Sequence, residues 1–244
     1  MKNIGIVCEG PTDFILLKAV IDGITDEHNR YFLLQPESDL TGQYGNGWKG
    51  VWKWCRDHAA IKKVLMKSVT PQLDLLIIHM DGDVSRRERA VHCLCEERNC
   101  GYQGVQDPMQ CDSMRAIREL CPICIPCEMH EPSAAGCMDH LESLIASWLM
   151  DDISETCIVI PCDSMEAWIV AAYDARIDAE DIADPWQTVI ARKKAYHDIR
   201  IPGGKKRTAV FCEFAERVCE NWDQVTRYCQ SAKRFEQRIT DALS

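Results

Sequence analysis

The sequence has no long hydrophobic run. No stretch approaches the roughly 18 consecutive apolar residues that a membrane-spanning helix needs. Near the N-terminus, Glu9 and Asp13 interrupt what would have to be the apolar segment of a signal peptide. We therefore expect a cytoplasmic protein without a membrane partner.

An excess of positive charge is also missing. The 28 Lys and Arg residues are outnumbered by 38 Asp and Glu residues, which gives a formal net charge of −10. This balance argues against a protein that coats nucleic acid non-specifically, because such proteins are basic overall. It leaves room for a nucleic-acid enzyme, in which a metal site and a local basic patch receive the phosphate backbone.

Internal repeats and low-complexity linkers are absent as well, and 244 residues suffice to bury a complete core. Short apolar runs alternate with helical patterns, which predicts one α/β domain over 1–244 with a mainly parallel, Rossmann-like sheet flanked by helices. The C-terminal region is predicted to be mostly helical. The expected strands are 3–8, 31–35, 73–79 and 156–160, and the expected helices include 13–21 (with Thr12 as N-cap), 48–67 and 133–150.

Three acidic clusters are present, and each directly follows one of these apolar runs. They are Glu9 to Asp13, Asp81 to Asp83, and Asp163 to Glu166. If the runs are parallel strands of one sheet, all three clusters emerge at its carboxyl edge, where α/β proteins place their sites. Carboxylates gathered so closely raise one another's pKa unless a cation lies between them. The pattern therefore predicts a divalent-metal site.

The spacing of Asp81 and Asp83 suits such a site. Side chains alternate with period two along a strand, so the two carboxylates face the same side. Gly82 between them allows a ligand to approach the backbone closely. Mg²⁺ prefers a few carboxylate oxygens together with water and phosphate, and two such ions about 3.5–4 Å apart can promote phosphodiester hydrolysis.

These residues resemble a known family. Glu9-Gly10-Pro11-Thr12-Asp13 followed by Asp81-Gly82-Asp83 is similar to the Toprim catalytic domain of topoisomerases, primases and OLD-type nucleases. Ser164-Met165-Glu166 resembles the additional acidic motif of the OLD-type nucleases, which are often found in phage-defence systems. The resemblance covers about 1–85 and 155–210.

The resemblance implies a Mg²⁺- or Mn²⁺-dependent endonuclease with a Toprim fold. It implies Glu9 as a metal ligand or general acid/base, Asp81 and Asp83 as metal ligands, and Asp13 and Glu166 as a second metal position. It also implies nucleic acid, DNA or RNA, as the substrate. Any ATPase partner is expected to be a separate chain, and formation of homo-oligomers is left open.

Acidic residues that follow strands also have a simpler interpretation, as helix caps or turn residues. Asp13 is equally suited to cap a helix, and Asp163 is better suited to a turn than to a metal. Glu9 is different, because it precedes Gly-Pro and caps nothing obvious. His79, at the end of an expected strand, is interpreted as a packed core residue.

A basic segment, Ile201 to Arg207, precedes a late helical pattern. Its glycine turn presents Lys205 and Lys206 at the start of that helix, where they can hold a phosphate or a developing negative charge. By resemblance to the late lysine of OLD-type nucleases, Lys205 is the first candidate and Lys206 the second. A solvated basic loop is the alternative. The glycine-rich stretch 42–50 lacks P-loop spacing and is interpreted as a plain loop.

Cysteine is abundant, and eight of the 15 cysteines lie between Cys93 and Cys137. The helical and strand patterns fade over 84–137, so this stretch is interpreted as an insertion. Cys121-Pro122-Ile123-Cys124 has the spacing of a zinc knuckle, and bound zinc would supply folding energy to the insertion. Buried free thiols are the alternative. The candidate zinc ligands are Cys95, Cys100, Cys111, Cys121, Cys124 and Cys127.

Two classes of function compete at this point. The first is the metal-dependent nuclease, acting as a phage-defence effector. The second is a catalytically silent, zinc-stabilised module that regulates a partner ATPase. A phosphotransfer domain is a third option, against which the spacing of Asp81 and Asp83 counts.

Overall fold

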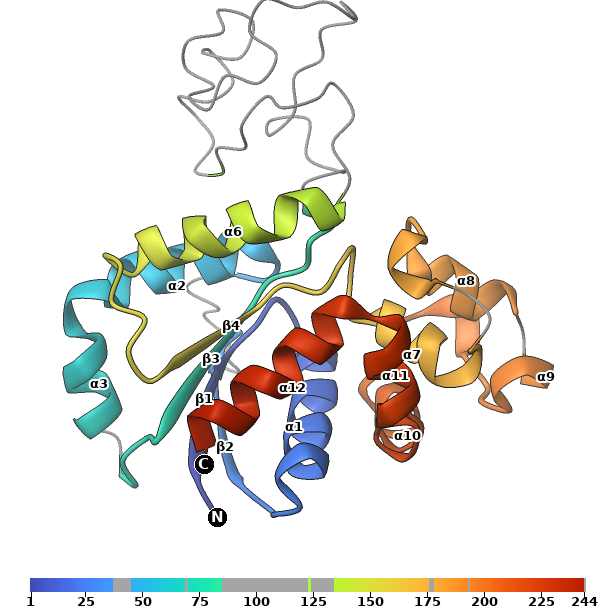
Figure 1. Ribbon diagram of the computed structural model, residues 1–244, viewed down its shortest axis with the longest axis horizontal. Coiled ribbons are helices and arrows are strands. Elements are labelled where there is room, and N and C mark those ends of the chain that lie inside the picture. The colour runs from blue at the N-terminus through green and yellow to red at the C-terminus, as the bar shows by residue number, and fades with distance from the viewer. Residues whose placement is uncertain are drawn as a thin grey trace, which may run out of the picture.

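The protein has an α/β fold built on a four-stranded parallel sheet (Figure 1). The structure, a computed structural model, describes residues 1–36, 45–68, 70–84, 123, 134–175, 178–192 and 194–243. The strand order is β2-β1-β3-β4. The strands are β1 (Asn3–Val7), β2 (Arg30–Gln35), β3 (Leu75–His79) and β4 (Thr156–Val159).

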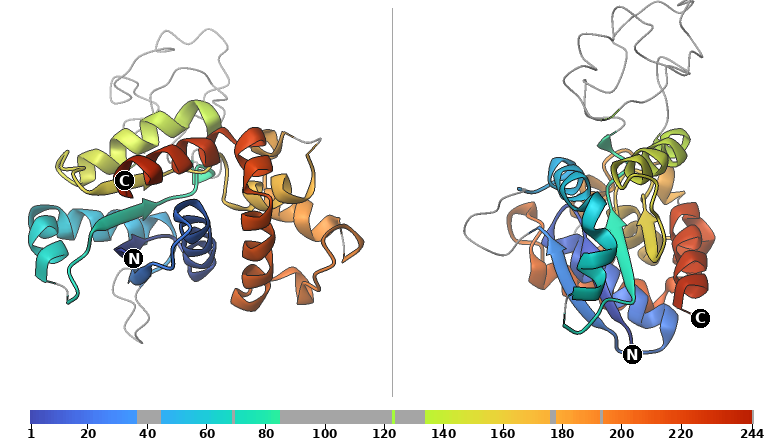
Figure 2. Two further views of the ribbon diagram at one scale, coloured as in Figure 1. Left: turned by 60° about the horizontal axis from the view of Figure 1, so that its bottom comes forward. Right: turned by 90° about the vertical axis from the view of Figure 1, so that its left-hand side faces the viewer.

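Helices cover both faces of this sheet (Figure 2). The helices before β4 are α1 (Pro11–Thr25), α2 (Trp48–His58), α3 (Lys62–Ser68) and α6 (Ala134–Trp148). Those after β4 are α7 (Glu166–Tyr173), α8 (Pro185–Ala191), α9 (Lys194–His197), α10 (Thr208–Glu220), α11 (Trp222–Tyr228) and α12 (Gln230–Leu243). Short 3₁₀ turns are η1 (Ala59–Ile61), η3 (Ala179–Asp181) and η4 (Pro202–Gly204).

The alternation of strand side chains divides the core into two layers. Ile4, Ile6 and Ile77 pack with α1, α7, α10 and α12 on one face. Leu76 and Ile78 pack with α2 and α6 on the other. Because β3 is buried on both faces, its sequence is a continuous apolar run.

The predicted parallel sheet and the helical C-terminal region are confirmed. The expected helix 48–67 is interrupted by η1, which separates α2 from α3. The prediction of Thr12 as N-cap is wrong: α1 begins at Pro11, and Gly10 is its N-cap. Nearly all of the insertion 84–137, with all six candidate zinc ligands, lies outside the described residues.

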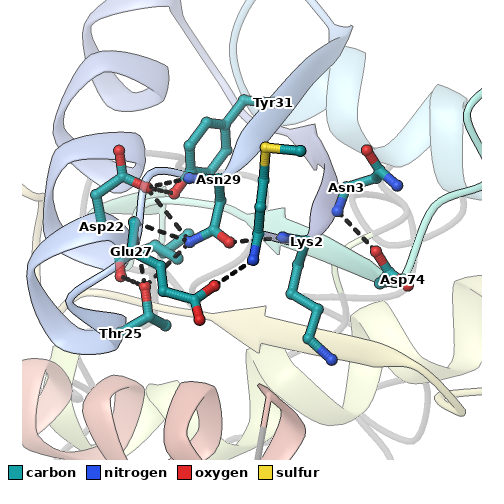
Figure 3. Close-up of polar contacts among 10 residues, drawn as sticks. Lys2, Asn3, Asp22, Thr25, Glu27, Asn29, Tyr31 and Asp74 are labelled. Carbon is teal, nitrogen blue, oxygen red and sulfur yellow. Dashed lines mark hydrogen bonds and ion pairs between the residues drawn. The ribbon is translucent and has the colours of Figure 1, made fainter.

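At the amino end of the sheet, polar contacts fix the turn between α1 and β2 (Figure 3). One carboxylate oxygen of Asp22 accepts hydrogen bonds from the backbone N–H of Asn29 at 2.9 Å and from the Tyr31 hydroxyl at 2.6 Å. This turn lies at the opposite end of the strands from the acidic clusters. Its acidic residue therefore has a structural role.

Among the described residues, no helix is both long and apolar enough to cross a lipid bilayer.

Candidate metal site at the carboxyl edge

The three acidic clusters lie at one edge of the sheet. They follow β1, β3 and β4, which are neighbouring parallel strands. Val7 is in register with Ile78, and His79 with Val159, so the three strands end at nearly the same level. The sequence-based placement of the clusters at a common edge is therefore confirmed.

Backbone hydrogen bonds continue beyond the strands and position the Asp81–Asp83 turn. The Gly82 N–H donates to the carbonyl of Pro161 at 3.1 Å, and the Asp83 N–H to that of Asp163 at 2.7 Å. A β-carbon on Gly82 would lie 2.5 Å from the Pro161 oxygen, so a larger residue would push the two turns apart. Asp163 adopts a left-handed conformation with φ +62°, in keeping with its interpretation as a turn residue.

Glu9 connects the first cluster to the second. One of its carboxylate oxygens accepts a hydrogen bond from the Asp81 N–H at 2.9 Å. Its backbone carbonyl accepts another from the Gly47 N–H at 3.0 Å, which places the start of α2 beside it. Burial, and next the charge of Asp81, raise the pKa of Glu9 well above its ordinary value.

Asp13 both caps α1 and faces the cluster. Its Oδ2 accepts a hydrogen bond from the Gly10 N–H at 2.8 Å, so the capping interpretation is confirmed. The same oxygen lies 3.9 Å from Nδ1 of His79. Burial raises the pKa of Asp13 to about 7; the positive charge of His79 opposes this shift, whereas Asp81 and Glu166 add to it.

His79 is the positive centre of the cluster, a role that sequence reasoning missed. It is fully buried, and its Nε2 lies 3.4 Å from Oδ1 of Asp81. Burial alone would lower its pKa, but contact with Asp81 and the charges of Asp13 and Glu9 outweigh burial and raise the pKa to about 9. The sequence held one usable signal, because His79 precedes Asp81 by two residues and faces the same side.

Glu166 and Lys206 complete the site. Glu166 lies in the first turn of α7, where the helix dipole favours its negative charge. Its Oε1 lies 2.5 Å from the ammonium nitrogen of Lys206. Burial lowers the pKa of Lys206, but the charges of Glu166, Asp81 and Asp13 outweigh burial, so the pKa is raised above its ordinary value. Both candidate lysines are exposed, and it is Lys206 whose ammonium group reaches the cluster.

The cluster thus combines four carboxylates with two cationic side chains. Glu9, Asp13, Asp81 and Glu166 interact electrostatically with one another or with Lys206. Asp83 is half-buried and is positioned by its backbone, whereas it is Asp81 that contacts His79.

The donor atoms fit the oxygen preference of Mg²⁺ or Mn²⁺. Oδ1 of Asp81 is buried and accepts no hydrogen bond, although Nε2 of His79 lies 3.4 Å from it. Within the part of the chain that the structure describes, however, no group of three or more Asp, Glu, His or Cys side chains is arranged to hold a metal ion. The carboxylates are paired with His79, Lys206 and backbone N–H groups instead. Binding of an ion would require Lys206 and the acidic side chains to rearrange.

Comparisons with protein-family models, with curated proteins and with solved structures find no match to this chain.

The contrast between two buried histidines gives a spectroscopic prediction. At pH 7.5 we expect His79 to be an imidazolium, because its pKa is raised to about 9. His197 should be neutral, because burial lowers its pKa. Nitrogen-15 chemical shifts of the two rings, assigned with His79→Gln and His197→Gln variants, distinguish these states.

The same shift makes the stability of the protein depend on pH. The pKa of His79 in the folded chain lies above its ordinary value of 6.5. Its contribution, up to about 3 kcal/mol, is therefore complete below pH 6.5 and lost as the pH rises through 9. A neutral His79 at pH 7.5 would contradict this account of the cluster.

Proposed function

We propose that the protein is a metal-dependent phosphodiesterase that cleaves nucleic acid, as its resemblance to Toprim nucleases implies. The observation that carries the proposal is the convergence of Glu9, Asp13, Asp81 and Glu166 from separate elements at one sheet edge. Structural acids at strand ends are normally isolated caps. Here burial and the charge of Asp81 raise the pKa of both Glu9 and Asp13, and the charge of Glu166 adds to the shift of Asp13, a pattern that is typical of functional sites.

The carboxylates would hold Mg²⁺ or Mn²⁺, with Glu9, Asp13, Asp81, Asp83 and Glu166 as the candidate ligands. When bound, such an ion polarises the phosphoryl oxygens and lowers the pKa of water.

The chain's own groups have distinct roles in the proposed reaction. Attack of water on phosphorus forms one P–O bond and breaks the bond to the leaving oxygen. Glu9, which the Asp81 N–H holds in the cluster, accepts the proton of the attacking water. Lys206 stabilises the negative charge that develops on the phosphoryl oxygens. The leaving oxygen takes a proton from solvent, which gives a phosphate monoester and a free hydroxyl.

A second candidate function is favoured by the pairing of these acids within the protein. Because His79, Lys206 and backbone N–H groups already neutralise or bond them, the cluster can also serve as a structural lock. The protein would then be the catalytically silent, zinc-stabilised module that regulates a partner ATPase.

Replacement of Asp81 by Asn separates the two candidates. We expect Asp81→Asn to reduce Mg²⁺-dependent cleavage of plasmid or total RNA by at least about 100-fold, because the change removes a ligand charge. The matched control is Asp57→Asn, which removes an aspartate from an exposed ion pair on α2. Cleavage by Asp81→Asn at the wild-type rate would reject the nuclease. If regulation of the partner ATPase is retained in Asp81→Asn and lost in Cys121→Ser, the second candidate function is supported.

The two adjacent lysines provide a second matched pair. Lys206→Met should lower the cleavage rate by about 100-fold or more, because it removes a charge next to the reacting phosphate. Lys205→Met should cleave like the wild type, since it is Lys206 whose ammonium group is paired with Glu166 in the acidic cluster. Steady-state cleavage assays and thermal unfolding of both variants distinguish a catalytic effect from a loss of folding. Equal effects of the two substitutions would contradict the assignment of Lys206.

A further inference from the structure

A cavity of about 530 Å³ lies between α8, α9 and η4. Its volume is within the range of pockets that bind small organic ligands. Aliphatic side chains form much of its lining, and a few polar side chains accompany them. The lining includes Ile190, Ala191, Ile199 and Ile201, together with Gln187 and Arg200.

One wall of this cavity is an uncharged aromatic ring. His197 lines the cavity and is buried, and its Nδ1 accepts a hydrogen bond from the Ile199 N–H at 3.1 Å. Its Nε2 lies 3.3 Å from the carbonyl of Val189 and is therefore placed to donate to it. The cavity thus combines apolar and aromatic surface with the charge of Arg200 and the amide of Gln187. Such a lining suits a flat heterocycle that carries hydrogen-bonding edges and a nearby phosphate.

The segment that bounds the cavity also carries the catalytic lysine. Gly204, the last residue of η4, lines the cavity, and Lys206 follows two residues later. Two residues span at most about 7 Å of chain. Trp186 fixes this segment, because its indole N–H donates to the Gly204 carbonyl at 2.9 Å and its ring lies 5.9 Å from the ammonium nitrogen of Lys206. A ligand in the cavity is therefore adjacent to the proposed reaction site.

We infer that this cavity binds the base of an unpaired nucleotide in the substrate strand, next to the phosphodiester that the acidic site cleaves. This inference rests on the proposed function and specifies its substrate as single-stranded nucleic acid. A base enters a pocket only when it has left the helical stack, so base-paired regions are excluded. Arg200 binds the phosphate or the polar edge of the nucleotide, and Gln187 offers a donor and an acceptor to the base.

Binding in the absence of divalent ions tests the inference without cleavage. The full-length protein, in EDTA, is titrated into fluorescently labelled oligonucleotides that are single-stranded or duplex. Ala191→Trp fills the cavity from an exposed position of α8, and its control is Ala60→Trp in η1. Arg200→Ala removes the charge, and its control is Arg227→Ala in α11. Thermal unfolding confirms that each variant is folded.

We expect Ala191→Trp to weaken binding of the single strand by about tenfold or more. Arg200→Ala should weaken it several-fold and make binding less dependent on salt. Both controls should bind like the wild type, and the duplex should bind more weakly than the single strand. Wild-type affinity in both cavity variants, or equal affinity for the duplex, overturns the inference. The inference is also overturned if the two cavity variants lose binding of nucleoside monophosphates but bind the single-stranded oligonucleotide like the wild type.

A base-free substrate separates the cavity from the reaction. Bis(p-nitrophenyl) phosphate is a phosphodiester without a nucleobase, and its hydrolysis by the wild-type protein in Mn²⁺ reports on the acidic site alone. If the cavity variants weaken binding of the single strand but the wild-type protein hydrolyses no bis(p-nitrophenyl) phosphate, the proposed function is rejected and the cavity assignment stands. If the wild-type protein hydrolyses this substrate but both cavity variants bind the single strand with wild-type affinity, the cavity assignment is rejected and the proposed function stands.

Discussion

The mutual repulsion of carboxylates at the carboxyl edge of the sheet is the constraint on which the site depends. Four of them come from the loop after β1, from α1, from the turn after β3 and from α7, and burial makes their charges costly. The structure meets this cost in two ways: backbone N–H groups of Gly10 and Asp81 bind two of the acids, and the cations of His79 and Lys206 face the others.

The ammonium group of Lys206 is paired with Glu166 in the structure. Under the proposed function, Glu166 would be one of the carboxylates that hold a divalent ion, and Lys206 would face the substrate phosphate. The side chain of Lys206 is 41% exposed, whereas Glu166 is buried.

The sheet and the edge at which the acids gather could be predicted from the sequence, because both follow from local patterns. The buried run of β3 marks a central strand, and residues that follow parallel strands meet at one edge.

Which cationic side chains pair with the acidic residues could not be predicted in this way. Nothing in the sequence distinguishes Lys205 from Lys206, since the choice depends on how η4 enters α10. His79 fits a core strand equally well whether it packs among apolar groups or between two acids. The N-cap of α1 was misplaced at Thr12 because threonine is a good cap, whereas Gly10 takes that position with Asp13 closing the capping box.

The central claim is that the acidic cluster binds a divalent ion. Titration of the full-length protein with Mn²⁺ at pH 8, followed by electron paramagnetic resonance without nucleic acid, tests it most directly. The account predicts that protein reduces the free Mn²⁺ signal, that excess Mg²⁺ restores it, and that Glu9→Gln abolishes the effect. A free Mn²⁺ signal identical with and without the wild-type protein would contradict it.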